Sequence, residues 1–175
     1  MSLLLLFNQE TESALAGAKF AEPILTQIET LLKRDMATKI AEINSEYSDS
    51  AVLTEPRSDA YYWGNVDFLR GLPAICIFSI DSIGEIYDNL SVRTDHTIAV
   101  KITVKHNVQL IVKLVLRYLR AITEILCATT QLELAVDQCK YAGHEYMPIS
   151  EMENGWYVYS GIALFSIDAT DQVRT

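Results

Sequence analysis

The chain has 175 residues, half of them hydrophobic, and a formal net charge of -9 at neutral pH. This length fits a single domain with a sizeable core, and the negative charge argues against nonspecific binding to DNA or to an anionic membrane surface. The acidity is uneven. Residues 1–95 carry 7 basic and 15 acidic side chains, net -8, whereas residues 96–175 carry 7 and 8, net -1. Such asymmetry either serves solubility or suits a protein that meets different partners on different faces.

Residues 1–20 are expected to form an N-terminal arm. Its start, MSLLLLFNQE, has a short leucine run without basic residues, which does not fit a signal peptide. No segment of the chain is long and apolar enough to predict a membrane span. The apolar tip, which includes Leu4 and Leu5, either folds onto its own core or docks on a neighbouring subunit, since exposed apolar patches tend to mark contacts.

An amphipathic helix is predicted from Pro23 to about residue 45, because proline suits the first position of a helix. Apolar side chains then recur at helical spacing; they are Ile24, Ile28, Leu31, Leu32, Met36, Ile40 and Ile43. Glu29 and Lys33 form a favourable pair one turn apart. This helix is expected to cover one face of a sheet.

Residues 44–70 show no sustained periodicity and predict a long loop, which in a compact domain is often functional. The loop contains Tyr61, Tyr62 and Trp63. These aromatic side chains either anchor a partner or pin the loop to the core. After Gly71 and Pro73, residues 74–80 (AICIFSI) predict a short buried strand. Residues 81–95, rich in Asp, Ser, Gly and Asn, predict a loop or a poor hairpin.

The clearest signal runs from His96 to Thr130 and predicts one strand followed directly by one long helix. In HTIAVKITVKH the apolar side chains alternate with small or polar ones, which is typical of a strand with one buried face. Asn107 is a suitable N-cap. Beyond it the apolar period becomes helical, with Val108, Ile111, Val112, Val115, Leu119, Ile122, Ile125 and Leu126 on one broad side.

Residues 132–142 (LELAVDQCKYA) alternate again and predict a strand, and residues 143–155 predict a loop ending in the Asn154-Gly155 turn pair. The β-rich run 156–168 predicts the last strand, and 169–175 a polar tail. The order of elements indicates one α+β domain over residues 21–168. Its sheet is expected to be mostly antiparallel, with the N-terminal helix and the long central helix packed on one face. Whether the central strand–helix–strand unit is a parallel crossover remains open at this stage.

The basic side chains of the central helix form the most prominent surface feature of the sequence. Helical spacing places Lys113, Arg117 and Arg120 on one side. This stripe is either a solvated face or a contact with an acidic neighbour, such as the acidic half of another copy.

The three cysteines, Cys76, Cys127 and Cys139, are an odd number in apolar segments, which predicts buried reduced thiols. Cys139 and His144, with Glu145 beside it, invite the hypothesis of a nucleophilic site. Closeness in sequence is weak evidence for such a site, and the spacing supplies no further metal ligands. Glycines are scattered, so no phosphate loop is indicated. We therefore expect no catalytic residue, no cofactor and no metal.

The order of elements resembles the tail terminator, or tail-completion, family of tailed bacteriophages. The resemblance is carried by the helix over residues 23–43, the short strand after Pro73, and the HTIAVKITV strand that runs into a helix containing RYLRAI (residues 117–122). The loop containing YMP at residues 146–148 and the closing strand complete it.

The resemblance implies a non-enzymatic structural protein of the virion tail or neck, present in the host cytoplasm during assembly. Members of the family form a ring, commonly a hexamer, that caps the tail tube and joins it to the head connector. The implied partners are other copies of the chain, the tail tube protein and the connector protein. DNA would pass through the lumen without sequence-specific binding, and no membrane is involved.

Under this interpretation, the candidate subunit or partner contacts are the basic stripe, the loop aromatics and the apolar tip. Opposite charges on the two faces of each subunit would favour closure of a head-to-tail ring. The alternatives are another neck or tail adaptor protein, or a small cytosolic enzyme with a Cys–His site.

Overall fold

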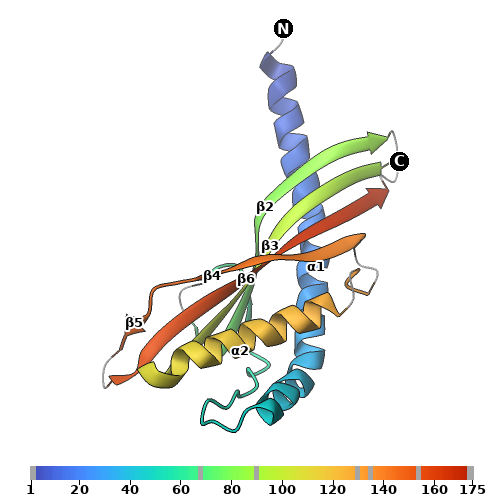
Figure 1. The fold of residues 1–175 in the computed structure, drawn as a ribbon. Helices are drawn as coiled ribbons and strands as arrows, with labels where there is room; N and C mark the ends of the chain where they lie inside the picture. The colour runs from blue at the N-terminus through green and yellow to red at the C-terminus, as the bar shows by residue number, and fades with distance from the viewer. Residues whose placement is uncertain are drawn as a thin grey trace.

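The computed structural model describes residues 3–66, 69–88, 91–128, 131–133, 136–152 and 155–172. Within them the chain forms an α+β fold with an N-terminal helix, a central helix and a six-stranded, mostly antiparallel sheet (Figure 1). The elements in chain order are α1 (Leu3–Glu46), β1 (Tyr61–Trp63), β2 (Ala74–Asp88), β3 (Ser91–His106), α2 (Val108–Cys127), β4 (Gln138–Tyr146), β5 (Ser150–Glu151) and β6 (Tyr157–Gln172). The α+β class predicted from the sequence is confirmed.

The sheet has the strand order β1-β2-β3-β6-β4, and the short β5 pairs with β6 beside β4. All neighbours are antiparallel except β1, which runs parallel to β2. Because β3 and β4 are both antiparallel to β6, they run parallel to each other with β6 between them. The central strand–helix–strand unit is therefore a parallel crossover that leaves room for one inserted strand.

The first helix is much longer than the sequence analysis predicts. It begins at Leu3 and continues through Pro23, so residues 3–20, expected to form an N-terminal arm, are the first part of this helix. These residues include five Leu and three Ala, which are good helix formers. A proline inside a helix removes one backbone hydrogen bond, yet the helix is continuous there. Figure 1 shows the N-terminal part of α1 extending beyond the sheet.

The segment 81–95, predicted as a loop or a poor hairpin, belongs to two long antiparallel strands that are consecutive in the chain, as in a hairpin. β2 and β3 pair from Ala74↔Thr103 to Asp88↔Ser91, with bulges between Ser79 and Asp81 and between Ile86 and Asp88. The loop alternative, which rested on polar composition, is wrong because pairing and burial override β propensity. β3 pairs on both sides here, so its polar Thr94 and His96 are buried.

Two further boundaries differ from the sequence analysis. Residues 131–133 form a turn, with Leu132 and Glu133 at positive φ values of 44° and 57°, so the strand predicted over 132–142 begins only at Gln138. Leu132 is apolar because its side chain is buried beneath this turn. The expected polar tail also continues as strand to Gln172, where it pairs with Ser91. The long loop after α1 includes one short strand, β1.

Both helices cover the same face of the sheet and close one hydrophobic core. Asn107 caps α2 as predicted, accepting a hydrogen bond from the Leu110 amide at 3.0 Å. On the sheet, the helix-covered face includes Ile75, Ile77, Ile98, Val100, Ile102, Ala163, Phe165 and Ile167, all fully buried. The opposite face, called the outer face below, carries Lys101, Thr103 and Ser160, and the Thr103 and Ser160 hydroxyls hydrogen-bond at 2.9 Å.

The closest approach between α2 and the sheet is at Gly161 of β6. A Cβ atom at this position would lie 2.7 Å from Cδ1 of Leu119 and 2.7 Å from Cγ1 of Val115. Leu119 and Val115 are buried, so a Cβ atom at Gly161 would force core side chains to shift. The absence of a side chain at Gly161 thus allows α2 to lie directly on β6.

We expect Gly161→Ala to lower the free energy of unfolding by about 1–3 kcal/mol, since overpacking a filled core costs this much. Gly71→Ala is the matched control, because a Cβ atom there meets nothing within 4 Å. Urea unfolding of both variants measures the difference. Equal midpoints for the two variants would contradict this account of the α2–β6 contact.

Candidate functional site

The basic stripe predicted on α2 is already paired within the chain. Arg117 donates to both carboxylate oxygens of Asp49, at 2.9 and 2.8 Å, and to the Ala51 carbonyl. Its guanidinium also lies 3.7 Å from the centre of the Tyr47 ring. Lys113 reaches the same carboxylate of Asp49 at 3.2 Å. Arg117 is thus a buried side chain that holds the segment after α1 against α2.

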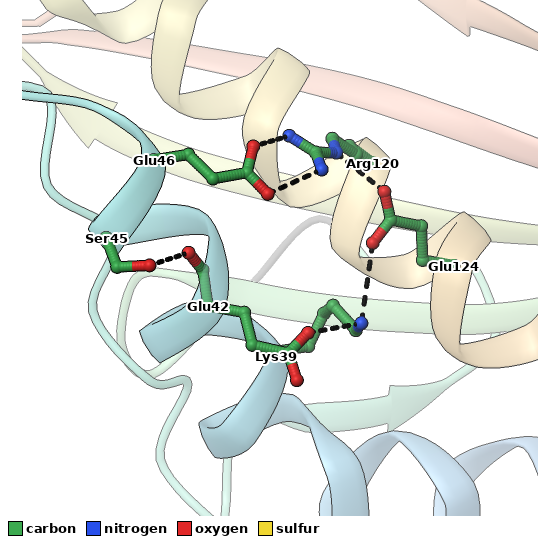
Figure 2. A network of polar contacts seen from close by, with 6 residues as sticks. All are labelled: Lys39, Glu42, Ser45, Glu46, Arg120 and Glu124. Atoms are coloured by element: carbon green, nitrogen blue, oxygen red, sulfur yellow. Dashed lines mark hydrogen bonds and ion pairs between the residues drawn. The ribbon is translucent and has the colours of Figure 1, made fainter.

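Arg120 joins the two helices in a similar way (Figure 2). It donates to Glu46 at the end of α1, at 2.9 Å, and to Glu124 one turn along α2, at 2.6 Å. Lys39 then links Glu124 to Glu42. The hydrogen bond from Arg120 lowers the pKa of Glu46 below its usual range. All three side chains of the stripe are thus paired within the chain; Arg117 is buried, whereas Lys113 and Arg120 remain partly exposed to solvent.

Two more contacts fix the segment that follows α1. Asn44 bonds the Leu53 backbone twice, accepting from its amide at 2.8 Å and donating to its carbonyl at 2.9 Å. The Tyr118 hydroxyl, on the buried side of α2, accepts from the Thr54 amide at 2.9 Å and donates to the Thr54 carbonyl. Although this segment has no regular secondary structure, its backbone is held firmly.

The loop aromatics Tyr61, Tyr62 and Trp63 lie in β1 and pin it to the rest of the fold. The Trp63 indole donates to Glu29 of α1 at 2.6 Å, and Lys33 lies 5.2 Å from the centre of the Tyr61 ring. The Tyr62 hydroxyl accepts from the Arg70 amide. Of the two interpretations left open, the geometry favours attachment to the core. The tip residues Leu4 and Leu5 lie in α1, and their side chains fall outside the described part of the structure.

Cys139 and His144 do not come together as a nucleophilic pair. Both lie on β4, where Cys139 pairs with Ile167 and His144 with Ala163, four residues apart on β6 and thus about 13 Å apart along the strand. Burial raises the pKa of Cys139 to about 12, so its thiolate is scarce at neutral pH. The Nδ1 atom of His144 bonds the Tyr141 hydroxyl instead. Cys127, expected to be buried, is exposed at the end of α2.

Exposed apolar side chains gather where the first half of α2 meets the end of β4 and the following turn. This apolar end surface consists of Val108, Val112, Leu116, Tyr141, Tyr146, Met147, Ile149, Met152 and Trp156, each between 39% and 51% exposed. A groove of about 350 Å³ adjoins it; Leu116, Tyr141 and Tyr146 line one part of the groove, and Arg120, Glu124 and His144 are among the residues that line the rest. The nine residues of the apolar end surface itself offer shape and apolar area.

Several aromatic rings at this surface contact one another. His144 and Tyr146 lie edge to face with centres 5.1 Å apart, and Tyr146 stacks on Tyr159 at 6.2 Å. At the far end Trp156 meets His106 edge to face at 6.0 Å. The sequence analysis placed Val108 and Val112 on the buried side of α2, which was wrong. The available signal was the width of the apolar arc, since Val108, Val112 and Leu116 form a second stripe at helical spacing.

Two other features are absent from the described residues, a cluster of metal ligands and a helix that could span a membrane. No group of three or more His, Cys, Asp or Glu side chains is arranged to hold a metal ion. In the same part of the chain, no helix has the length and apolar character needed to cross a bilayer. Neither a protein-family model nor a curated protein sequence matches this chain.

Replacing Asp49 by asparagine is expected to lower stability at neutral pH. The hydrogen bond from Arg117 holds the pKa of Asp49 well below its ordinary value of about 4. The ionised carboxylate therefore stabilises the fold at pH values above about 4. This contribution is lost as the pH falls towards the folded-state pKa. The difference in urea midpoint between wild type and Asp49→Asn should therefore be largest at pH 7 and shrink below about pH 4.

Asp59→Asn is the matched control, because Asp59 pairs with Arg57, whose side chain is 75% exposed, and such surface pairs contribute little. A difference between wild type and Asp49→Asn that stays constant from neutral to acidic pH would contradict the role given to Asp49.

Thiol labelling should distinguish the three cysteines. In the native protein a maleimide should modify Cys127 alone, because Cys76 and Cys139 are buried. The other two should react only after unfolding, and a Cys127→Ser variant should show no native labelling. Mass spectrometry of the labelled peptides gives the assignment. Rapid native labelling of Cys139 would restore the hypothesis of a Cys–His site.

Proposed function

We propose that this chain is a non-enzymatic structural protein of a tailed bacteriophage, a tail terminator. In this proposal identical copies form a ring, six in the usual case for the family, which caps the tail tube and joins it to the head connector. The chain would accumulate in the host cytoplasm and end in the virion neck. DNA would cross the lumen of the ring without sequence-specific contacts.

The observation that carries the proposal is the apolar end surface. Monomeric proteins seldom expose many large apolar side chains in one region, and such regions usually mark contacts with other proteins. Its aromatic and methionine side chains, among them Trp156, Tyr146 and Met152, are the types enriched in the centres of protein interfaces. A protein that acts by binding, as a terminator does, needs a surface of this kind.

The internal pairing of the basic stripe changes one part of the argument. Lys113, Arg117 and Arg120 are matched by carboxylates of the same chain, so attraction between this stripe and a neighbouring subunit no longer supports a ring. Support now comes from the apolar end surface and from the resemblance in the order of elements. The central strand and helix on which that resemblance rests are present as β3 and α2.

The test is an electron-microscopic reconstruction of the assembled particle that contains this chain. We expect several copies related by rotational symmetry between the tail tube and the connector. A single copy, or copies without rotational symmetry, would contradict the ring. In the same particles the double variant Leu116→Glu/Trp156→Glu should be incorporated poorly, whereas Arg57→Glu, at an exposed loop position, should be incorporated normally.

A further inference from the structure

The two edges of the sheet are both open over most of their length. β4 pairs with β6 on one side, and no described strand lies on its other side. At the opposite edge β1 covers only residues 75–77 of β2, which leaves residues 78–88 without a described neighbour on that side. An open edge presents a row of unpaired backbone donors and acceptors, which is a template for another strand.

Both open edges carry exposed apolar side chains. Ile80 and Ile83 of β2 are 57% and 61% exposed, and Tyr141 and Tyr146 of β4 are 41% and 43% exposed. Proteins normally protect a long edge of this kind with proline, bulges or a dense row of charges. Here the open part of β2 has bulges between Ser79 and Asp81 and between Ile86 and Asp88, and β4 has one between Tyr141 and Gly143, but no proline interrupts either strand.

The directions of the strands make these edges complementary. Strand direction alternates from β2 through β3 and β6 to β4, so β4 runs opposite to β2. If a second copy is placed beside the first in the same orientation, its β2 lies antiparallel to the first copy's β4. Two β4 strands can meet only after one copy is turned around.

The register between the copies follows from two constraints. Along the sheet, Asp81 pairs with Thr97, Thr97 with Ser166, and Ser166 with Lys140, so Lys140 and Asp81 lie at the same level on the outer face. If these two residues faced each other across two copies, the end of β4 in one copy would occupy the place of β1 beside β2 in the other. The neighbouring copy must therefore shift along the strands by at least three residues. Side chains of paired residues share a face, which requires an even shift. The smallest allowed shift is therefore four residues, and it places Lys140 opposite Glu85.

Charge is divided in this register: the shift sets Lys140 opposite Glu85, an attractive pair, and also sets Glu145 of β4 opposite Asp81 of β2, a repulsive one. Lys140 and Glu85 are both exposed on the outer face, and within the described residues neither forms an ion pair. Opposite charges that face each other across antiparallel strands are favourable, and like charges are unfavourable. The open part of β2 also carries Asp81 and no basic side chain.

We propose, building on the ring suggested above, that copies of this chain join head to tail by pairing β4 of one copy with residues 78–88 of β2 in the next. The partner surface is thus a second copy of the same chain, and the contact extends the six-stranded sheet into its neighbour. A head-to-tail contact of this type generates a ring when the rotation closes.

Cross-linking between two separately labelled variants tests the pairing. In a Cys127→Ser background, Lys140→Cys and Glu85→Cys proteins are prepared separately, then mixed at a concentration at which the parent protein self-associates and treated with a short bis-maleimide. The mixture should give a cross-linked dimer, and neither variant should do so alone. Equal cross-linking in the single preparations, no cross-linking in the mixture, or a parent protein that stays monomeric at the highest concentration reached would overturn the proposal.

Charge reversal provides a second measurement that does not depend on cysteines. Lys140→Glu and Glu85→Lys should each weaken self-association about fivefold in sedimentation equilibrium, and the double variant should recover most of the loss. Arg57→Glu should leave association unchanged, and circular dichroism checks that all variants fold. Self-association that is unchanged in both single variants would overturn the edge pairing.

The outcomes separate this inference from the proposed function. A symmetric ring in the particle whose subunits fail to cross-link between Lys140→Cys and Glu85→Cys would overturn the edge pairing and leave the terminator role standing. Cross-linked head-to-tail assemblies of a chain that is absent from any tail would uphold the pairing and remove the terminator role.

Discussion

The structure depends on the pairing of β3 along both of its sides. All of its residues from Ser91 to His106 pair with β6, and most of them also pair with β2. One face of this three-stranded centre is apolar and receives both helices, and Gly161 allows α2 to lie against it without a gap. β1, β4 and β5 are additions to a centre that these contacts already define.

The charged side chains of α2 have the spacing expected of an exposed helix face, but they form ion pairs within the chain. Arg117 is almost fully buried, and it satisfies a carbonyl and a carboxylate in a segment that has no helix or strand to satisfy them. Removing one partner of such an arrangement leaves an unpaired polar group, which costs more than the arrangement itself contributes. The sequence places the arginine on the correct side of α2, but only the fold brings Asp49 to it, 68 residues away.

Periodicity predicted the α+β class, the strand and helix that begin at His96, and the cap at Asn107, because each is encoded within a few consecutive residues. It failed where long-range pairing decides the outcome. The polar residues 81–95 become strand because β6 and β2 satisfy their backbone groups, and Leu132 alternates with its neighbours by coincidence in a turn. Contacts between distant segments, such as Trp63 with Glu29, have no local signal. For the same reason, the sequence indicates the apolar end surface only through the apolar arc of α2, which is wider than the side of the helix that is buried.

The four-residue shift imposed by β1 also determines the geometry of any closed assembly. Each copy would add four strands to a common barrel, β2, β3, β6 and β4, together with a shear of four residues. Strand number and shear then rise together, so their ratio is the same for any number of copies. With a rise of about 3.3 Å per residue and about 4.8 Å between strands, this ratio gives a strand tilt of about 35°. Tilts of roughly 35–45° are usual for closed barrels, so the edge geometry of one subunit is compatible with closure whatever the circumference.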